Sequence, residues 1–296
     1  MPRSTRLFAR LSPFRRRQFR AGISLHSHTT HSRESFAGLP WTPPLSPAQA
    51  VALESGQIQD LGLEPLVSLT DHDNIEAALE LRATQEGRRA PISVEWSVPW
   101  RGAEMHLGIH NMPPVRARQR MAALARFTTI PRESDLHDIL DWLHEDPSTL
   151  IVWNHPLWDE TGLGSERYRT VSTEFLRCYR PWIHALEVNG LRSWKENRRV
   201  MQWAEAEALP SVSGGDRHGW EPNAFLNLTR AATLAEFIDE VREDRRSHVL
   251  VMPQYGHSLP RRLWANWPNR YNRRDEAAIL SLPTAGGRLR TGTENA

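Results

Sequence analysis

Histidine and carboxylate side chains recur along this chain, each beside a short apolar segment. Spread over nearly two hundred positions, they are His26, His28, Asp71, His72, Glu95, His155, Glu187, Asp216 and His218. Imidazole nitrogen and carboxylate oxygen bind Zn, Mn or Fe, and a cluster with several anionic ligands can hold more than one such ion. The single cysteine, Cys178, excludes an intramolecular disulfide framework and a cysteine-based zinc site. These residue types therefore predict a metal site with nitrogen and oxygen ligands.

Short apolar runs mark the strands that must position these residues. The candidate strands are Ile23–Leu25, Leu66–Leu69, Ile92–Val94, Met105–Ile109, Leu150–Trp153, Ala185–Val188, Val212–Ser213 and Val249–Met252. Between them, apolar residues recur with helical spacing over 136–143 and 234–241, and the second segment begins with Thr233 and Glu236 in capping-box spacing. Weaker helical patterns cover 48–59, 75–85 and 196–208.

Strand and helix alternate along most of the chain, and this order predicts parallel strands joined by crossover helices. At 296 residues and 39% hydrophobic content, the chain can bury one large core. The expected fold class is therefore α/β, and the number of strands favours a barrel over an open sheet. Because the carboxyl ends of barrel strands converge on one face, the histidines and carboxylates would meet in one pocket.

Charge divides the chain into an acidic body and two basic ends. Residues 1–20 carry seven arginines and no acid, and residues 261–296 carry seven arginines against three acids. Subtracting both ends from the overall net charge of +2 leaves −9 for residues 21–260. An acidic body suits a site for several cations, because its carboxylates offset their charge. We expect a disordered basic tail over 1–20, a barrel domain over 21–255 and an extended tail over 256–296.

Each of these features also has an ordinary structural explanation when it is taken alone. Two histidines separated by one residue are usually unrelated, Asp71 can cap a helix that begins near Ile75, and Glu95 can pair with Arg101. The segment 214–216 can be a simple turn. The probability that five independent explanations hold at five successive strand ends is small, because their separate probabilities multiply. One metal site accounts for all five.

The order of the motifs resembles the PHP (polymerase and histidinol phosphatase) family. In chain order the motifs are LHSHTT (25–30), TDHD (70–73), VEWS (94–97), HLG (106–108), NHP (154–156), LEVNG (186–190) and GGDRHG (214–219). Each motif is weak, but the ordered set is specific. The resemblance implies a distorted (β/α)7 barrel, two to three divalent metal ions (Mn, Zn or Fe), and hydrolysis of a phosphate ester by a metal-bridging hydroxide.

The resemblance also implies a set of metal ligands, with each motif supplying one or two. They are His26, His28, Glu34, His72, Glu95, His106, His155, Asp216 and His218. Glu95 would bridge two metals. The family has a further ligand shortly after its first two histidines, normally Asp or His, and here the candidates are Glu34 and His31. Glu34 is preferred because a longer carboxylate can replace the usual residue.

Three of the motif residues are candidate catalytic groups. Asp216 or His218 would accept a proton from water or protonate the leaving oxygen, and the sequence leaves that choice open. Asp71 would orient His72 or a ligand on an adjacent strand. A phosphate also needs donors outside the metal ligands. The candidate substrate-binding residues are Arg217, Arg101, Arg192 and Glu187.

Two other functions are compatible with these motifs. An amidohydrolase-like enzyme generally needs a carbamylated lysine or a single final aspartate, but the only lysine of the chain, Lys195, lies off every expected strand. A non-catalytic, nucleic-acid-associated PHP module would lose ligands, whereas this chain keeps nearly all of them. We therefore expect an enzyme that acts on a phosphorylated small molecule or a nucleotide, in preference to nucleic acid.

The sequence also bears on location. No apolar run approaches the ~20 residues that span a bilayer, and no basic segment followed by an apolar stretch indicates secretion. We expect a protein without a membrane span, located in the cytoplasm. Its oligomeric state is not determined by the sequence.

Overall fold

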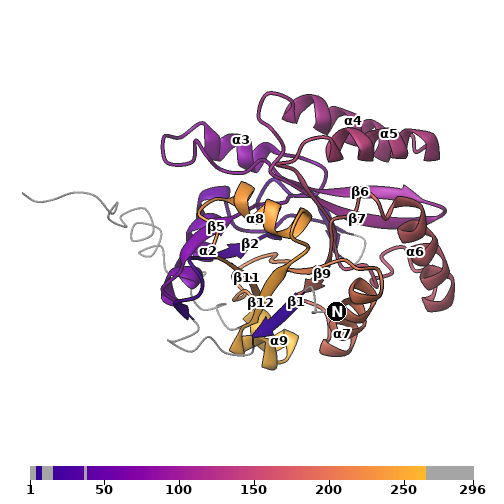
Figure 1. The fold of residues 1–296 in the computed structure, drawn as a ribbon. Helices are drawn as coiled ribbons and strands as arrows, with labels where there is room; N and C mark the ends of the chain where they lie inside the picture. Colours follow the sequence, from indigo (N-terminus) through magenta and orange to yellow (C-terminus); the bar gives the residue numbers. More distant parts are fainter. Residues whose placement is uncertain (1–4, 9–15, 37–38, 265–296) are drawn as a thin grey trace, which may run out of the picture.

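The computed structural model describes residues 5–8, 16–36 and 39–264, which form a mixed α/β fold (Figure 1). Two five-stranded sheets hold most of its strands. The first sheet contains, in spatial order, β1 (Thr5–Phe8), β12 (Ser247–Val251), β11 (Phe225–Thr229), β2 (Ala21–Ser24) and β5 (Glu64–Val67). The outer pairs, β1 with β12 and β2 with β5, are parallel, whereas β11 is antiparallel to both of its neighbours.

The second sheet is also mixed. In spatial order it contains β10 (Ser211–Gly214), β9 (Ala185–Asn189), β8 (Leu150–Trp153), β7 (Ala103–His110) and β6 (Val94–Trp100). Strands β8, β9 and β10 are parallel, and β7 is antiparallel to both of its neighbours. A small hairpin of β3 (Glu34–Phe36) and β4 (Leu39–Trp41) stands apart from the two sheets.

Strand direction differs from the parallel arrangement that the alternation of elements predicts. No helix connects β6 to β7, because Arg101 and Gly102 form a tight turn with φ of 50° and 82°. Positive φ at both central residues is the geometry of a two-residue hairpin turn, and glycine adopts it without strain. The chain therefore reverses there and pairs antiparallel.

The structure does not show the expected closed (β/α)7 barrel. Most of its strands form two separate sheets whose hydrogen-bond ladders are not continuous with each other. The two sheets are linked by isolated contacts and not by a continuous ladder. On one side, His72 and Glu95 form an isolated parallel bridge between the end of β5 and the start of β6. On the other side, the Asn227 side chain accepts a hydrogen bond from Ser213 N (2.7 Å) and donates one to Ser213 O (2.9 Å), linking β11 to β10.

Helices lie around the strands, with α3, α4 and α5 along the upper edge of Figure 1 and α6 and α7 at its right. Their bounds are α2 Pro47–Asp60, α3 Glu76–Arg82, α4 Ala117–Thr129, α5 Glu133–His144, α6 Ser165–Tyr179, α7 Trp194–Ala206, α8 Leu234–Arg242 and α9 Leu259–Trp264, with a 3₁₀ turn at Pro253–Gly256. Ser46 and Gln49 form a capping box that starts α2. At α8, Thr233 accepts a hydrogen bond from Glu236 N, as its capping-box spacing predicts.

The largest part of the core packs helices against the second sheet. The ring of Trp153 on β8 is fully buried, and its centroid lies 5.0 Å from that of Phe175 on α6 and 5.3 Å from that of Trp203 on α7. Large aromatic contacts of this kind stabilise a fold beyond their buried area. They hold β8 and β9 in place, and the residues that follow these strands are thereby positioned.

The chain ends differ in part from the tails that charge predicts. Thr5–Phe8 form β1, and α9 lies within the expected tail over 256–296. The remainder of that tail, 265–296, lies outside the described residues. Within the described part of the chain, no helix has the length and apolar character needed to cross a membrane.

Candidate metal centre

The Glu95 carboxylate, near the start of β6, faces several imidazoles at once. Its Oε2 lies 2.9 Å from His26 Nε2, 3.3 Å from His28 Nε2 and 3.4 Å from His72 Nε2. The two nitrogens of His26 and His28 are 3.0 Å apart. Three imidazole nitrogens therefore point at one carboxylate oxygen from the ends of two different strands.

The other oxygen of Glu95 has partners from the second sheet. Its Oε1 lies 3.1 Å from His155 Nε2 and 3.5 Å from His106 Nδ1, and it accepts a hydrogen bond from Asn154 Nδ2 at 2.9 Å. The outer nitrogen of His106 lies 3.1 Å from Glu104 Oε1. Glu95 is thus shared between histidines of both sheets.

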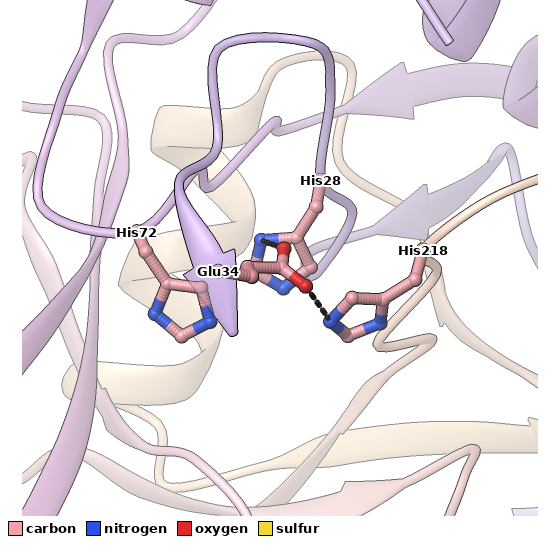
Figure 2. A group of neighbouring side chains, drawn as sticks. All are labelled: His28, Glu34, His72 and His218. Atoms are coloured by element: carbon pink, nitrogen blue, oxygen red, sulfur yellow. Dashed lines mark ion pairs between the residues drawn. The ribbon is translucent and has the colours of Figure 1, made fainter. Parts of the chain in front are cut away.

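Glu34 lies on the β3–β4 hairpin among the rings of His28, His72 and His218 (Figure 2). Its Oε2 is 3.2 Å from His218 Nε2, and its Oε1 is 3.7 Å from His28 Nδ1. Of the two candidates for this position, His31 lies elsewhere, with its Nε2 2.7 Å from Glu80 on the surface.

Asp216 lies beside the imidazoles that face Glu95 and the imidazole of His218 that faces Glu34. Its Oδ1 is 3.5 Å from the Nε2 atoms of His26 and His28 and from His218 Nδ1. Its Oδ2 accepts a hydrogen bond from Asn189 Nδ2 at 3.0 Å.

Glu187 supports the site from β9. Its Oε1 lies 2.6 Å from His26 Nδ1, and its Oε2 accepts hydrogen bonds from His155 N and Asn189 Nδ2, each at 2.8 Å. A carboxylate on one ring nitrogen fixes the tautomer and leaves the other nitrogen free to bind a metal. Glu187 therefore orients a donor, and its expected contact with substrate stays a prediction.

Asp71 contacts the segment of chain that follows β2. Its carboxylate accepts hydrogen bonds from the backbone and hydroxyl of Thr29, the residue after His28. Asp71 therefore anchors the loop between β2 and Glu34. Its carboxylate makes no hydrogen bond to the His72 ring.

The expected substrate-binding arginines do not share one location. Arg217 is 1% exposed, and its Nε donates to Glu54 Oε1 at 2.6 Å, behind the cluster. Arg101 lies at the β6–β7 turn and pairs with Glu133 and Glu174, so it does not reach Glu95.

Arg192, in contrast, packs against an aromatic ring. Its guanidinium carbon lies 3.5 Å from the ring centroid of Trp158, three residues after His155. Trp158 is 40% exposed, so the pair is accessible to solvent.

Sequence reasoning missed several residues that contact the cluster. Asn154 and Asn189 lie inside the motifs NHP and LEVNG, so the motifs could have indicated that they belong to the site. No sequence motif indicates Glu104 or Trp41. The Trp41 ring centroid lies 5.9 Å from that of His218, and this contact depends on how the hairpin folds over the site.

Two of these positions have a positive backbone φ. His155 has φ of 29° and Asp216 has φ of 51°, a region that residues other than glycine seldom adopt. Nearby, a Cβ atom at Gly214 would lie 2.8 Å from His26 Cβ and would overlap the Glu187 carboxylate. Close approach of backbone to the site requires glycine at that position.

Burial and mutual attraction set the protonation of these groups. Burial raises the pKa of Glu95, but His26 and His72 outweigh it and hold the pKa well below its usual range. Burial lowers the pKa of His26, but Glu95, Glu187 and Asp216 raise it well above its usual value. In the absence of a metal, protons on the imidazoles balance the buried carboxylates.

The donor set fits divalent cations. Three groups of donor atoms, each lying within 4.8 Å of one another, are formed by His28, Glu34, His72 and His218; by His26, His28 and Glu95; and by His72, Glu95 and His106. Glu34 Oε1 and His106 Nδ1 are buried without a hydrogen-bond partner among the described residues. Buried polar atoms rarely lack partners, and a bound cation would satisfy both of these.

Comparison with known proteins supports the fold and assigns no family. No family model and no curated sequence match the chain. Among solved structures, PsfC from Pseudomonas syringae PB-5123 is similar with a TM-score of 0.54 at 16% identity, covering 85% of this chain and 98% of that one. At this identity the likeness shows the fold alone.

Two further structures are more distant. They are an amidohydrolase from Chromobacterium violaceum (TM-score 0.43, 17% identity, 82% of this chain and 96% of that one) and a candidate metal-dependent phosphoesterase from Bifidobacterium adolescentis ATCC 15703 (TM-score 0.43, 15% identity, 74% and 94%). At these TM-scores neither carries an argument about this chain.

Proposed function

We propose that this chain is a metal-dependent phosphoesterase of the PHP type, and that its two sheets form the distorted barrel of that family. The observation that supports this proposal is the convergence on Glu95 of five imidazoles from four separate segments of the chain. Nitrogen and carboxylate donors at this density suit Mn, Zn or Fe.

The donor atoms would hold two to three cations, with Glu95 shared between two of them. The proposed sets are His26 and His28 with Glu95 and Asp216; His72 and His106 with Glu95 and His155; and Glu34 and His218 with His28 and His72. Because the sets share residues, loss of one donor would disturb more than one cation.

Bound divalent cations would lower the pKa of water and offset the charge of a phosphate. The chain's own residues would supply the remaining functions. Arg192, held against Trp158, would bind a phosphate oxygen through its planar guanidinium. Asp216 lies beside His28 and His218. Either Asp216 or His218 would accept or return a proton during hydrolysis.

The test combines metal analysis with three classes of substrate: a phosphomonoester, a phosphodiester and a cyclic amide. We expect purified protein to contain divalent metal and to hydrolyse at least one phosphoester. A chelator should abolish this activity, and added Mn²⁺ should restore it. His28→Ala should lose metal, whereas His137→Ala, which alters an exposed histidine on α5, should not. Metal-loaded protein that cleaves only the amide would support the amidohydrolase-like alternative and contradict the proposal.

A further inference from the structure

Glu54 is a fully buried carboxylate near the middle of α2, outside the candidate metal centre. A buried charge is costly unless it is paired and hydrogen-bonded. Its Oε1 accepts hydrogen bonds from Arg217 Nε (2.6 Å) and Ser27 Oγ (2.9 Å), and its Oε2 accepts one from Asn223 Nδ2 (2.9 Å). All of its contacts are thus made to loops that adjoin the site.

Two of these partners alternate with candidate metal ligands. Ser27 separates the two histidines of the first arm, 26–28, and Arg217 separates Asp216 from His218 in the second arm, 216–218. The side chains of Ser27 and Arg217 both bond Glu54. Their neighbours lie together instead, because Asp216 Oδ1 is 3.5 Å from the Nε2 atoms of His26 and His28 and from His218 Nδ1. The middle residue of each arm therefore turns to Glu54, while the residues on either side of it face the metal centre.

The two arms have partners of their own, since Ser27 N donates to Thr70 Oγ1 (3.3 Å) and Asn189 Nδ2 donates to Asp216 Oδ2 (3.0 Å), and they also lie side by side. They form one isolated parallel bridge between Ser27 and Arg217, in which His28 N donates to Arg217 O (2.8 Å) and Arg217 N donates to His26 O (3.3 Å). Strands β2 and β10, which lead into the arms, belong to different sheets. The bridge and the shared carboxylate behind it therefore connect the two arms directly.

We propose that Glu54 is a positioning residue that fixes the spacing between the two ligand arms through Ser27 and Arg217. The inference rests on the proposed metal-binding function. It also gives Arg217 a role behind the ligands, in place of direct contact with substrate. Removing the Glu54 charge leaves the Arg217 guanidinium buried without a counter-charge, and its Nη1 already lacks a hydrogen-bond partner among the described residues.

The first experiment is Glu54→Gln, which keeps the size of the side chain and removes its charge. We expect Co²⁺, used as a spectroscopic probe, to bind roughly tenfold to a hundredfold more weakly, because groups that orient ligands typically contribute that much. The visible absorption of the bound cobalt should also change. The matched control is Arg120→Met, which removes an equally buried arginine on α4, away from the site. The control should lower the melting temperature and leave cobalt affinity unchanged.

A double variant separates positioning from stability. Replacing a buried ion pair with apolar residues is often neutral for stability, so Glu54→Leu with Arg217→Met should melt near the wild-type temperature. It should still bind cobalt weakly. The proposal is overturned if Glu54→Gln binds cobalt within twofold of wild type with an unchanged spectrum, or if Arg120→Met weakens binding equally.

A measurement on chelated protein tests the positioning without any metal. The imidazole nitrogen signals of His26, His28 and His218 in NMR spectra should move in Glu54→Gln and stay in place in Arg120→Met. If wild-type protein binds no cobalt, the proposed function fails, and these signals alone decide the role of Glu54. Unchanged signals in the folded variant would overturn the inference.

Discussion

Both oxygens of Glu95 face imidazoles, and its side chain is 1% exposed. Glu95→Gln keeps the size of this side chain and removes the charge that would offset two cations. We expect at least one metal to dissociate and turnover of a phosphoester to fall by about a hundredfold or more, because each cation contributes several kcal/mol to catalysis. Metal content, turnover and melting temperature would be measured together. Full metal stoichiometry with near-normal turnover would show that Glu95 does not bridge metals.

The pair formed by Glu34 and His218 predicts a pH dependence in metal-free protein. Burial lowers the pKa of His218, but Asp216 and Glu34 outweigh it and raise the pKa from 6.5 to about 10. A raised pKa contributes stability below pH 6.5 that is lost as the pH rises toward 10. In chelator, the difference in unfolding free energy between wild type and His218→Gln should therefore shrink over this interval. A difference that stays constant or grows would contradict the prediction.

At the scale of elements, the β3–β4 hairpin places an aromatic ring beside the site. Trp41 pairs with Glu34 across the hairpin, so both side chains lie on one face, and the Trp41 ring is 37% exposed. If a substrate carries an aromatic group, Trp41→Ala should raise its KM about threefold to tenfold, as the loss of one aromatic contact predicts. The KM of an alkyl phosphoester should change little. Trp194→Ala, at another exposed tryptophan, is the control, and equal effects on both substrates would exclude stacking on Trp41.

The first strand should contribute to stability and not to chemistry. β1 pairs with β12 at the outer edge of the first sheet, and Thr5 Oγ1 accepts a hydrogen bond from Ser211 N at 2.7 Å. Deleting residues 1–8 should lower the melting temperature but preserve metal stoichiometry and turnover per folded molecule. Deleting residues 1–4 alone is the control. Loss of metal from the folded, shortened protein would show that β1 influences the site.

At the scale of the whole molecule, the candidate site joins the two sheets where their ladders do not meet. His26 and His28 follow β2 of the first sheet, whereas Glu95 and His106 belong to the second. Metal bound across this junction should stabilise the whole fold, because it binds only the folded state. With the metal at a hundred times its Kd, we expect a chelator to lower the melting temperature by about 5–10 °C. Glu95→Gln should respond less, and an unchanged wild-type melting temperature would contradict the prediction.

Several local features of the fold follow from the sequence by itself. The apolar run Leu150–Trp153 coincides with β8, and the spacing of Thr233 and Glu236 marks the start of α8. Such features depend on residues a few positions apart, so the local pattern of burial and capping determines them. The types of donor beside the strands also follow from the sequence, because the chemistry of imidazole and carboxylate does not depend on the fold.

Tertiary structure decided which strands pair, in which direction, and which side chains meet. The turn at Arg101 and Gly102 reverses the chain, and the short strands β1 and β11 pair with β12 and β2, which lie far away in the sequence. The same holds for Arg217, whose charge suggested a phosphate but whose position between Asp216 and His218 turns it toward Glu54, 163 residues away. No local pattern encodes such a contact, because its free energy arises when two distant segments are buried together.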